Sequence, residues 1–117
     1  MILEVKELTK NFGGVLAVDS LDFKISRGEI VGLIGPNGSG KSTTINLVCG
    51  LFSATGGTVS FLGKDLKNLS ADGRVAEGIA RTFQNIRLFN ELTVWQNLLV
   101  SWNDVDSNKS SWSSRWF

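Results

Sequence analysis

Nine residues, GPNGSGKST at Gly35–Thr43, constrain the fold of this chain more than any other stretch. They match G-x-x-x-x-G-K-[S/T], a pattern whose glycines let the backbone fold around an anion with several N–H groups pointing inward. Lys41 adds a mobile positive charge for β and γ phosphates, and the Ser42 hydroxyl can ligate Mg²⁺. A chance match at this composition has odds of roughly one in a hundred, so the surrounding sequence must decide.

A phosphate-binding loop follows a buried strand and opens a helix, and the sequence on both sides fits. Residues 29–34 (EIVGLI) leave no polar face, which predicts a strand buried on both sides in a parallel sheet. Residues 41–52 predict a helix that Gly50 ends, because apolar side chains recur there at helical spacing. The side chains of this predicted helical stripe are Ile45, Val48, Cys49 and Phe52.

Further strand patterns flank the loop. Apolar and polar residues alternate within residues 1–25 and again over 57–62, which predicts amphipathic strands in an antiparallel layer. Residues 79–84 predict another short strand. Together with the buried strand and its helix, these patterns predict an α/β fold, and 117 residues with 42% apolar content suit one modest domain.

Two more helices are predicted from their N-terminal caps. Ser70 is the expected N-cap of a short helix within residues 69–79. Thr93 and Gln96 form a capping-box pattern at the start of a helix over 92–102. One face of that helix carries Trp95, Leu98, Leu99 and Trp102.

Composition excludes several classes of protein. The chain has no histidine, which removes Ser-His and Cys-His nucleophile pairs and the commonest metal ligand. Cys49 is the one cysteine, so no internal disulfide can form, which favours a reducing compartment. A net charge of +1 gives no electrostatic reason to expect nucleic acid as a partner. The N-terminus does not have the pattern of a signal peptide, and no apolar run is long enough to cross a bilayer.

Three stretches resemble the ATPase subunits of ABC transporters, in particular those of branched-chain amino-acid importers. They are LTKNFGGVLAVDSLDF (8–23), RGEIVGLIGPNGSGKST (27–43) and GIARTFQNIRLFNELTVWQNLLV (78–100). The resemblance implies a P-loop NTPase core of the ABC type with an N-terminal antiparallel layer. It covers about residues 1–102 as the N-terminal part of a nucleotide-binding domain. Residues 103–117, rich in serine and tryptophan, form an atypical tail.

The resemblance implies a site for ATP and Mg²⁺. Phe12 matches the aromatic residue that stacks on adenine, although a hydrophobic loop residue in the core is the alternative. Val18 matches an apolar position near the base and ribose, and core packing is at least as good an interpretation. The positions that contact phosphate or magnesium are matched by Gly35, Asn37, Gly38, Ser39, Gly40, Lys41, Ser42 and Thr43.

Gln84 matches the glutamine that reaches Mg²⁺ or the attacking water and senses the transporter, which makes it the expected catalytic residue and, with Ser42, a metal ligand. Without the surrounding motif, Gln84 would be interpreted as an exposed amide. Asn85–Leu92 matches the surface that meets the transmembrane permease, but Leu88 and Phe89 equally fit the start of a helical core. These matches imply a cytoplasmic chain at the inner face of the plasma membrane.

Several elements of the family have no match in this sequence: the LSGGQ-like signature, the acidic-tipped Walker B strand and the downstream histidine. We therefore expect a truncated, frameshifted or fragmentary subunit that is incomplete at its C-terminus and not hydrolytically competent alone. A complete protein would pair with a second ATPase subunit. The alternatives are a non-catalytic ATP-binding fragment or inactive remnant and, less favoured, a P-loop kinase, for which no arginine-rich lid is evident.

Overall fold

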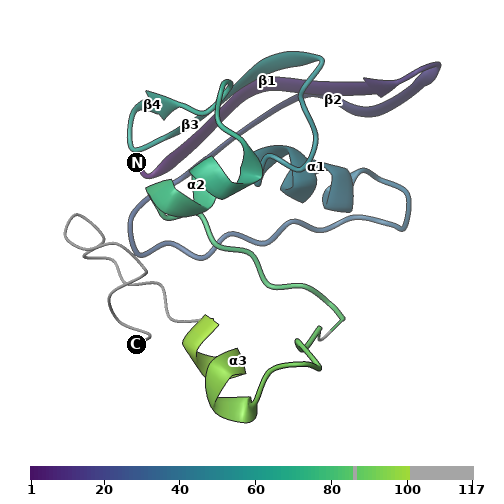
Figure 1. The fold of residues 1–117 in the computed structure, drawn as a ribbon. Coiled ribbons are helices and arrows are strands. Elements are labelled where there is room, and N and C mark those ends of the chain that lie inside the picture. The colour runs from purple at the N-terminus through teal and green to yellow at the C-terminus, as the bar shows by residue number, and fades with distance from the viewer. Residues whose placement is uncertain (86, 101–117) are drawn as a thin grey trace. The chain divides into compact units, whose positions relative to one another are not determined.

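The computed structural model describes residues 1–85 and 87–100, which form two compact units. The first unit covers Met1–Thr82, and the second begins at Phe83. The elements of the first unit are β1 (Leu3–Phe12), β2 (Val15–Ile25), α1 (Lys41–Val48), β3 (Gly56–Phe61), β4 (Lys64–Asp65) and α2 (Ala71–Glu77), and the second unit contains α3 (Val94–Val100) (Figure 1).

The strands of the first unit form one sheet in the order β2-β1-β3-β4, and every neighbouring pair is antiparallel. Val5 of β1 pairs with Phe23 of β2 and with Val59 of β3. The register shifts after Val5, where Glu7 has a φ of +47° and its N–H donates to the Asp22 carboxylate at 2.7 Å. The predicted antiparallel layer is confirmed.

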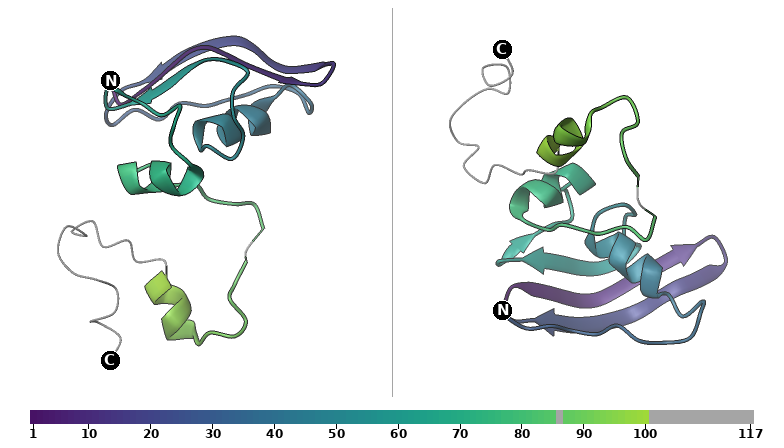
Figure 2. Two further views of the ribbon diagram at one scale, coloured as in Figure 1. Left: turned by 45° about the horizontal axis from the view of Figure 1, so that its top comes forward. Right: turned by 90° about the horizontal axis from the view of Figure 1, so that it is seen from below.

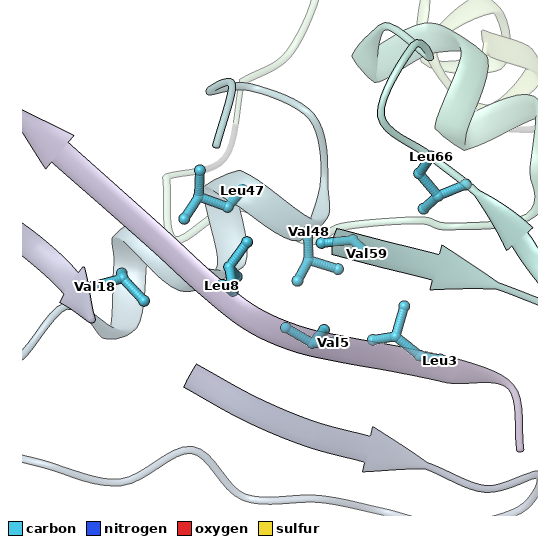
Figure 3. Close-up of a cluster of buried hydrophobic side chains, with 8 residues drawn as sticks. All are labelled: Leu3, Val5, Leu8, Val18, Leu47, Val48, Val59 and Leu66. Atoms are coloured by element: carbon cyan, nitrogen blue, oxygen red, sulfur yellow. The ribbon is translucent and has the colours of Figure 1, made fainter. Parts of the chain in front are cut away.

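The hydrophobic core lies between this sheet and α1 (Figure 3). The alternation of β1 turns Leu3 and Val5 toward α1, because successive side chains of a strand point to opposite faces. Helices α1 and α2 both cover this one face of the sheet (Figure 2). The buried apolar residues are Leu3, Val5, Leu8, Val18, Leu47, Val48, Val59 and Leu66.

The helix after the loop is confirmed, but the predicted stripe is partly wrong. Helix α1 buries Thr44, Leu47 and Val48, whereas Ile45 is 40% exposed. A buried threonine is tolerated because its hydroxyl donates to the Gly40 carbonyl at 2.9 Å. The face that meets the sheet is therefore set by packing into the core cluster, which helical spacing alone did not identify.

The strand predicted over residues 29–34 is wrong for this structure. These residues form no strand, and Ile30 and Ile34 are 99% and 92% exposed. A strand needs hydrogen bonds from a neighbouring strand, and the described residues supply no parallel partner. The short strand predicted over 79–84 is also wrong, since these residues belong to no helix or strand.

Both predicted helix caps are confirmed. Ser70 accepts a hydrogen bond from the N–H of Gly73 at 3.2 Å, which caps α2. In the second unit, the Thr93 hydroxyl accepts from the N–H of Gln96 at 3.2 Å, and the Gln96 side chain accepts from the N–H of Thr93 at 2.8 Å. Helix α3 is shorter than predicted, and Trp102 and the tail over 103–117 lie outside the described residues.

Candidate phosphate-binding site

The loop before α1 bends through two glycines in the left-handed region. Gly38 has a φ of +84°, and Gly40, the N-cap of α1, has a φ of +88°. A Cβ at Gly40 would lie 2.3 Å from the carbonyl oxygen of Ala17, closer than any non-bonded carbon can approach. Glycine at position 40 therefore serves both the backbone conformation and the close passage of the loop beside β2.

The N-cap residue of α1 makes no side-chain hydrogen bond to the first turn of the helix. Gly40 offers no side chain, and the first turn contains no acidic residue. The first N–H groups of a helix lack intrahelical partners and carry the positive end of its dipole, so they attract anions. Two hydrogen bonds stabilise the first turn of the helix. The N–H of Thr44 donates to the Gly40 carbonyl at 2.8 Å, and the Thr44 hydroxyl donates to the same carbonyl.

The ammonium group of Lys41 lies within the loop. It donates to the carbonyl oxygens of Gly35 at 2.6 Å and Pro36 at 2.7 Å, and to the Ser39 hydroxyl at 3.3 Å. These acceptors are uncharged, so they position the Lys41 ammonium without neutralising its positive charge. The cation is thus available for exchange onto a phosphate oxygen, which is a stronger, charged acceptor.

A hollow of about 300 Å³ lies at this end of α1. Three exposed or half-buried residues of β2 form one side of it and the loop and helix form the rest. The residues that line the hollow are Val15, Leu16, Ala17, Asn37, Gly38, Gly40, Lys41, Ser42 and Thr43. The structure therefore brings most of the predicted phosphate positions together.

Val15, Leu16 and Ala17 are residues of the site that sequence reasoning missed. Val15 is 65% exposed and Leu16 is 52% exposed, although both are apolar residues of a strand. The signal available in the sequence was the run GVLA (14–17) directly before Val18, which is more apolar than an exposed strand edge requires.

Phe12 and Val18 occupy different surroundings. Phe12 is 42% exposed, its ring meets that of Phe52 edge-on with centroids 5.5 Å apart, and the Lys10 ammonium lies 4.9 Å from its centroid. Phe12 does not line the hollow. Val18 is 6% exposed and packs in the core, which accounts for its apolar character. Their contacts with a nucleotide stay predictions.

Gln84 is an exposed residue of the second unit, so the geometry of the hollow involves the first unit only. Its catalytic and metal-binding roles stay predictions. Within residues 1–85 and 87–100, no group of three or more His, Cys, Asp or Glu side chains could hold a metal ion. In the part of the chain that the structure describes, every helix is too short or too polar to cross a bilayer.

Comparison with known proteins identifies relatives over most of the chain. Residues 18–116 match the sequence model of a family described as ABC transporter. BraF of Pseudomonas aeruginosa, a high-affinity branched-chain amino acid transport ATP-binding protein, is 44% identical over 100 residues, which are 86% of this chain and 39% of BraF. LivG of Escherichia coli K12, described in the same words, has the same identity and coverage.

Other relatives point to the same kind of protein. YbhF of Escherichia coli K12, a probable multidrug ABC transporter ATP-binding protein, is 47% identical over 83% of this chain and 16% of its own length. Among solved structures, the ATP-binding cassette MJ1267 of an ABC transporter superposes with a TM-score of 0.76 and 40% identity, over 85% of this chain and 39% of that one. The chain thus spans 39% of the length of the branched-chain relatives it matches.

Proposed function

The chain belongs to the ABC transporter family, and on that premise we propose that it binds Mg-ATP as part of a subunit that powers an importer of branched-chain amino acids. The observation that carries the nucleotide-binding part is the hollow at the N-terminal end of α1, where Gly40 passes Ala17 with no room for a Cβ. Family membership removes the reason for the P-loop kinase alternative.

The substrate class rests on similarity to BraF and LivG, at 44% identity each. Identity to the probable multidrug protein YbhF is 47%, so sequence identity supports the nucleotide-binding role more strongly than the transported substrate. Branched-chain amino acids remain the preferred class because the stretches 78–100 and 8–23 most resemble the importer ATPases.

In the proposed complex, the triphosphate occupies the hollow and receives hydrogen bonds from N–H groups of residues 38–43. Lys41 transfers its ammonium from the carbonyls of Gly35 and Pro36 to the β and γ phosphates. Val15 and Leu16 offer exposed apolar surface on the β2 side of the hollow, which suits the nucleoside. Phe12 is proposed to stack on the adenine through a ring face.

The first unit offers Mg²⁺ one protein ligand. Magnesium keeps several waters and is commonly held by one or two protein oxygens together with substrate phosphates. Ser42 is exposed in the first turn of α1 and supplies a hydroxyl, and Gln84 is proposed as a second ligand and as the residue that orients water. Bound Mg²⁺ would neutralise charge on the β and γ phosphates.

Hydrolysis by this chain alone is proposed to be negligible. Phosphoryl transfer needs a positioned water and acidic metal ligands in addition to the loop. The described residues hold no acidic cluster of that kind, and a second ATPase subunit would supply further groups in a complete transporter. The alternative function is that of a non-catalytic chain that binds ATP.

The second unit has an apolar surface that suits the binding of a protein partner. A hollow of about 570 Å³ there is lined largely by apolar side chains, among them Leu88, Phe89 and Leu98. The side chain of Asn97 accepts from the N–H of Phe89 at 3.0 Å and donates to the carbonyls of Phe89, Leu92 and Thr93. We propose that Asn85–Leu92 docks on the permease, which places the chain on the cytoplasmic face of the plasma membrane.

Titration of the 117-residue chain with fluorescent Mg-ATP tests the nucleotide-binding proposal. Lys41→Ala should weaken binding by at least about tenfold, because one lost charge-assisted hydrogen bond is worth roughly 1.5–3 kcal/mol. Lys64→Ala is the matched control, since Lys64 pairs with Glu77 on the surface away from the loop. Equal affinity of the wild-type chain and Lys41→Ala would contradict the proposal.

A further inference from the structure

Arg74 of α2 is a buried cation in a chain whose other charges lie mostly at the surface. Only 7% of the residue is exposed. Its guanidinium donates to four main-chain carbonyls: those of Leu47 and Val48 at 2.8 Å, that of Leu66 at 3.0 Å and that of Leu69 at 3.3 Å. One side chain therefore joins the end of α1, the segment after β4 and the segment before α2.

The carbonyls of Leu47 and Val48 belong to the last turn of α1, where the i+4 helical hydrogen bonds end, although that of Leu47 also accepts from the N–H of Gly50 at 3.2 Å. The N–H groups that would reach them in a longer helix, those of Leu51 and Phe52, donate to Asn46 instead. The last turn carries no basic residue of its own. A cation at the C-terminal end of a helix also complements the negative end of the dipole. Arg74 thus caps α1 from a different element.

Gly50 makes room for this cap. Its φ is +79°, and a Cβ at this position would lie 2.8 Å from Nε and 2.9 Å from Cδ of Arg74. Gly50, two positions after the end of α1, therefore turns the chain and leaves the space that the guanidinium fills. Burial lowers the pKa of Arg74 from its ordinary value, yet an arginine stays charged at neutral pH, so the cap remains cationic.

A second contact fastens the same helix. Nη1 of Arg81 donates to the side-chain oxygen of Asn46, in the C-terminal half of α1. Both contacts are made by residues at or just after α2, and both lie on the C-terminal half of α1. The N-terminal half of that helix forms the phosphate hollow.

We propose that Arg74 is a positioning residue of the phosphate site, which holds the C-terminal end of α1 and thereby sets where its N-terminal end presents the loop. An eight-residue helix is about 12 Å long, so a tilt of about 10° around its C-terminal end would move its first turn by about 2 Å. A displacement of that size is enough to spoil the alignment of N–H groups with a bound anion. The inference rests on the proposed nucleotide binding at this loop.

The test compares Arg74→Lys with Arg27→Lys in the full 117-residue chain. Arg74→Lys keeps the charge but replaces a planar fork by a single ammonium group, which cannot reach all four carbonyls. Arg27 is exposed in the turn before the loop segment and serves as the matched control. Two properties are measured at temperatures where melting curves show that every variant is folded. The first is the affinity for tripolyphosphate and for Mg-ATP. The second is the position of the amide resonances of Gly38 and Gly40 without ligand.

Arg74→Lys should shift both glycine resonances and weaken both ligands by about 10–100-fold, the range seen when groups that orient metal ligands are removed. Arg27→Lys should change neither. In Arg74→Ala, about 10 mM guanidinium should restore binding where the same concentration of sodium chloride does not, because free guanidinium can refill the cap.

Unshifted glycine amides, or unchanged affinity in Arg74→Lys, would overturn the inference. Failure of Arg74→Ala to fold, together with no effect of guanidinium, would show that the residue serves stability alone and would overturn it too. Failure of the wild-type chain to bind either ligand refutes the proposed function instead. The amide resonances then still decide whether Arg74 sets the conformation of the loop.

Discussion

Gly40→Ala is the substitution that the geometry of the loop predicts to be most damaging to phosphate binding. A non-glycine residue in the left-handed region costs roughly 1–2 kcal/mol. In addition, the new Cβ would lie 2.3 Å from the Ala17 carbonyl oxygen, which belongs to the backbone of β2 and cannot swing aside. Overpacking of that kind costs roughly 1–3 kcal/mol. The expected total is about 2–5 kcal/mol against the native loop.

Substitutions at two other glycines separate the cost of backbone strain from the cost of the clash with Ala17. Gly38 has a φ of +84° but open space around its Cβ position, so Gly38→Ala should cost only the backbone strain of roughly 1–2 kcal/mol. Gly14 has neither a positive φ nor a neighbour within 4 Å, so Gly14→Ala should stay within about 0.5 kcal/mol of the wild-type chain. The order of damage is therefore Gly40, then Gly38, then Gly14.

Urea unfolding and Mg-ATP titration of the three variants provide the assay. If the loop relaxes to remove the clash, the cost appears as lost affinity, and 2 kcal/mol corresponds to about 30-fold weaker binding. If the loop holds, the cost appears as a lower free energy of unfolding. Gly40→Ala that matches Gly14→Ala in both measurements would refute the reasoning, because neither the strain nor the contact with Ala17 would then be real.

Three further outcomes follow from burial and capping. Leu47→Ala should lower the free energy of unfolding by about 2–5 kcal/mol and Ile45→Ala by much less, because Leu47 is 2% exposed and Ile45 is 40% exposed. Urea titrations measure both losses, and similar losses for the two variants would contradict this prediction. Ser70→Ala should cost about 0.5–2 kcal/mol through loss of the α2 cap, which thermal melting with a Ser70→Thr comparison can measure. The chain should self-associate through the exposed apolar side chains of residues 29–34. The double variant Ile30→Lys, Ile34→Lys should therefore have a lower sedimentation coefficient than the wild-type chain. An unchanged coefficient would contradict self-association through this surface.

Elements determined by local chemistry were predictable from the sequence. The capping box of Thr93 and Gln96, the Ser70 cap and the alternation around Val5 each depend on residues a few positions apart. The loop before Lys41 was predictable for the same reason, since its pattern of glycines reports the backbone conformation directly. These features require no knowledge of distant segments.

Features determined by distant partners were not predictable in the same way. Residues 29–34 have the composition of a buried strand, but strand formation depends on a neighbour that the described residues do not supply. The buried face of α1 depends on how the helix meets the sheet, and hydrophobicity alone favoured Ile45 over Thr44. Arg74 has the sequence character of a solvated helix residue, and only the fold brings the carbonyls of α1 to its guanidinium.

The central claim is that the N-terminal end of α1 and its loop hold the phosphates of a nucleotide. A crystal structure of the chain with Mg²⁺ and a non-hydrolysable ATP analogue tests it most directly. We predict phosphate oxygens within hydrogen-bonding distance of the N–H groups of residues 38–43, with the Lys41 ammonium moved from the Gly35 carbonyl to the phosphates. A nucleotide bound elsewhere, with Lys41 still donating to Gly35 and Pro36, would contradict the account.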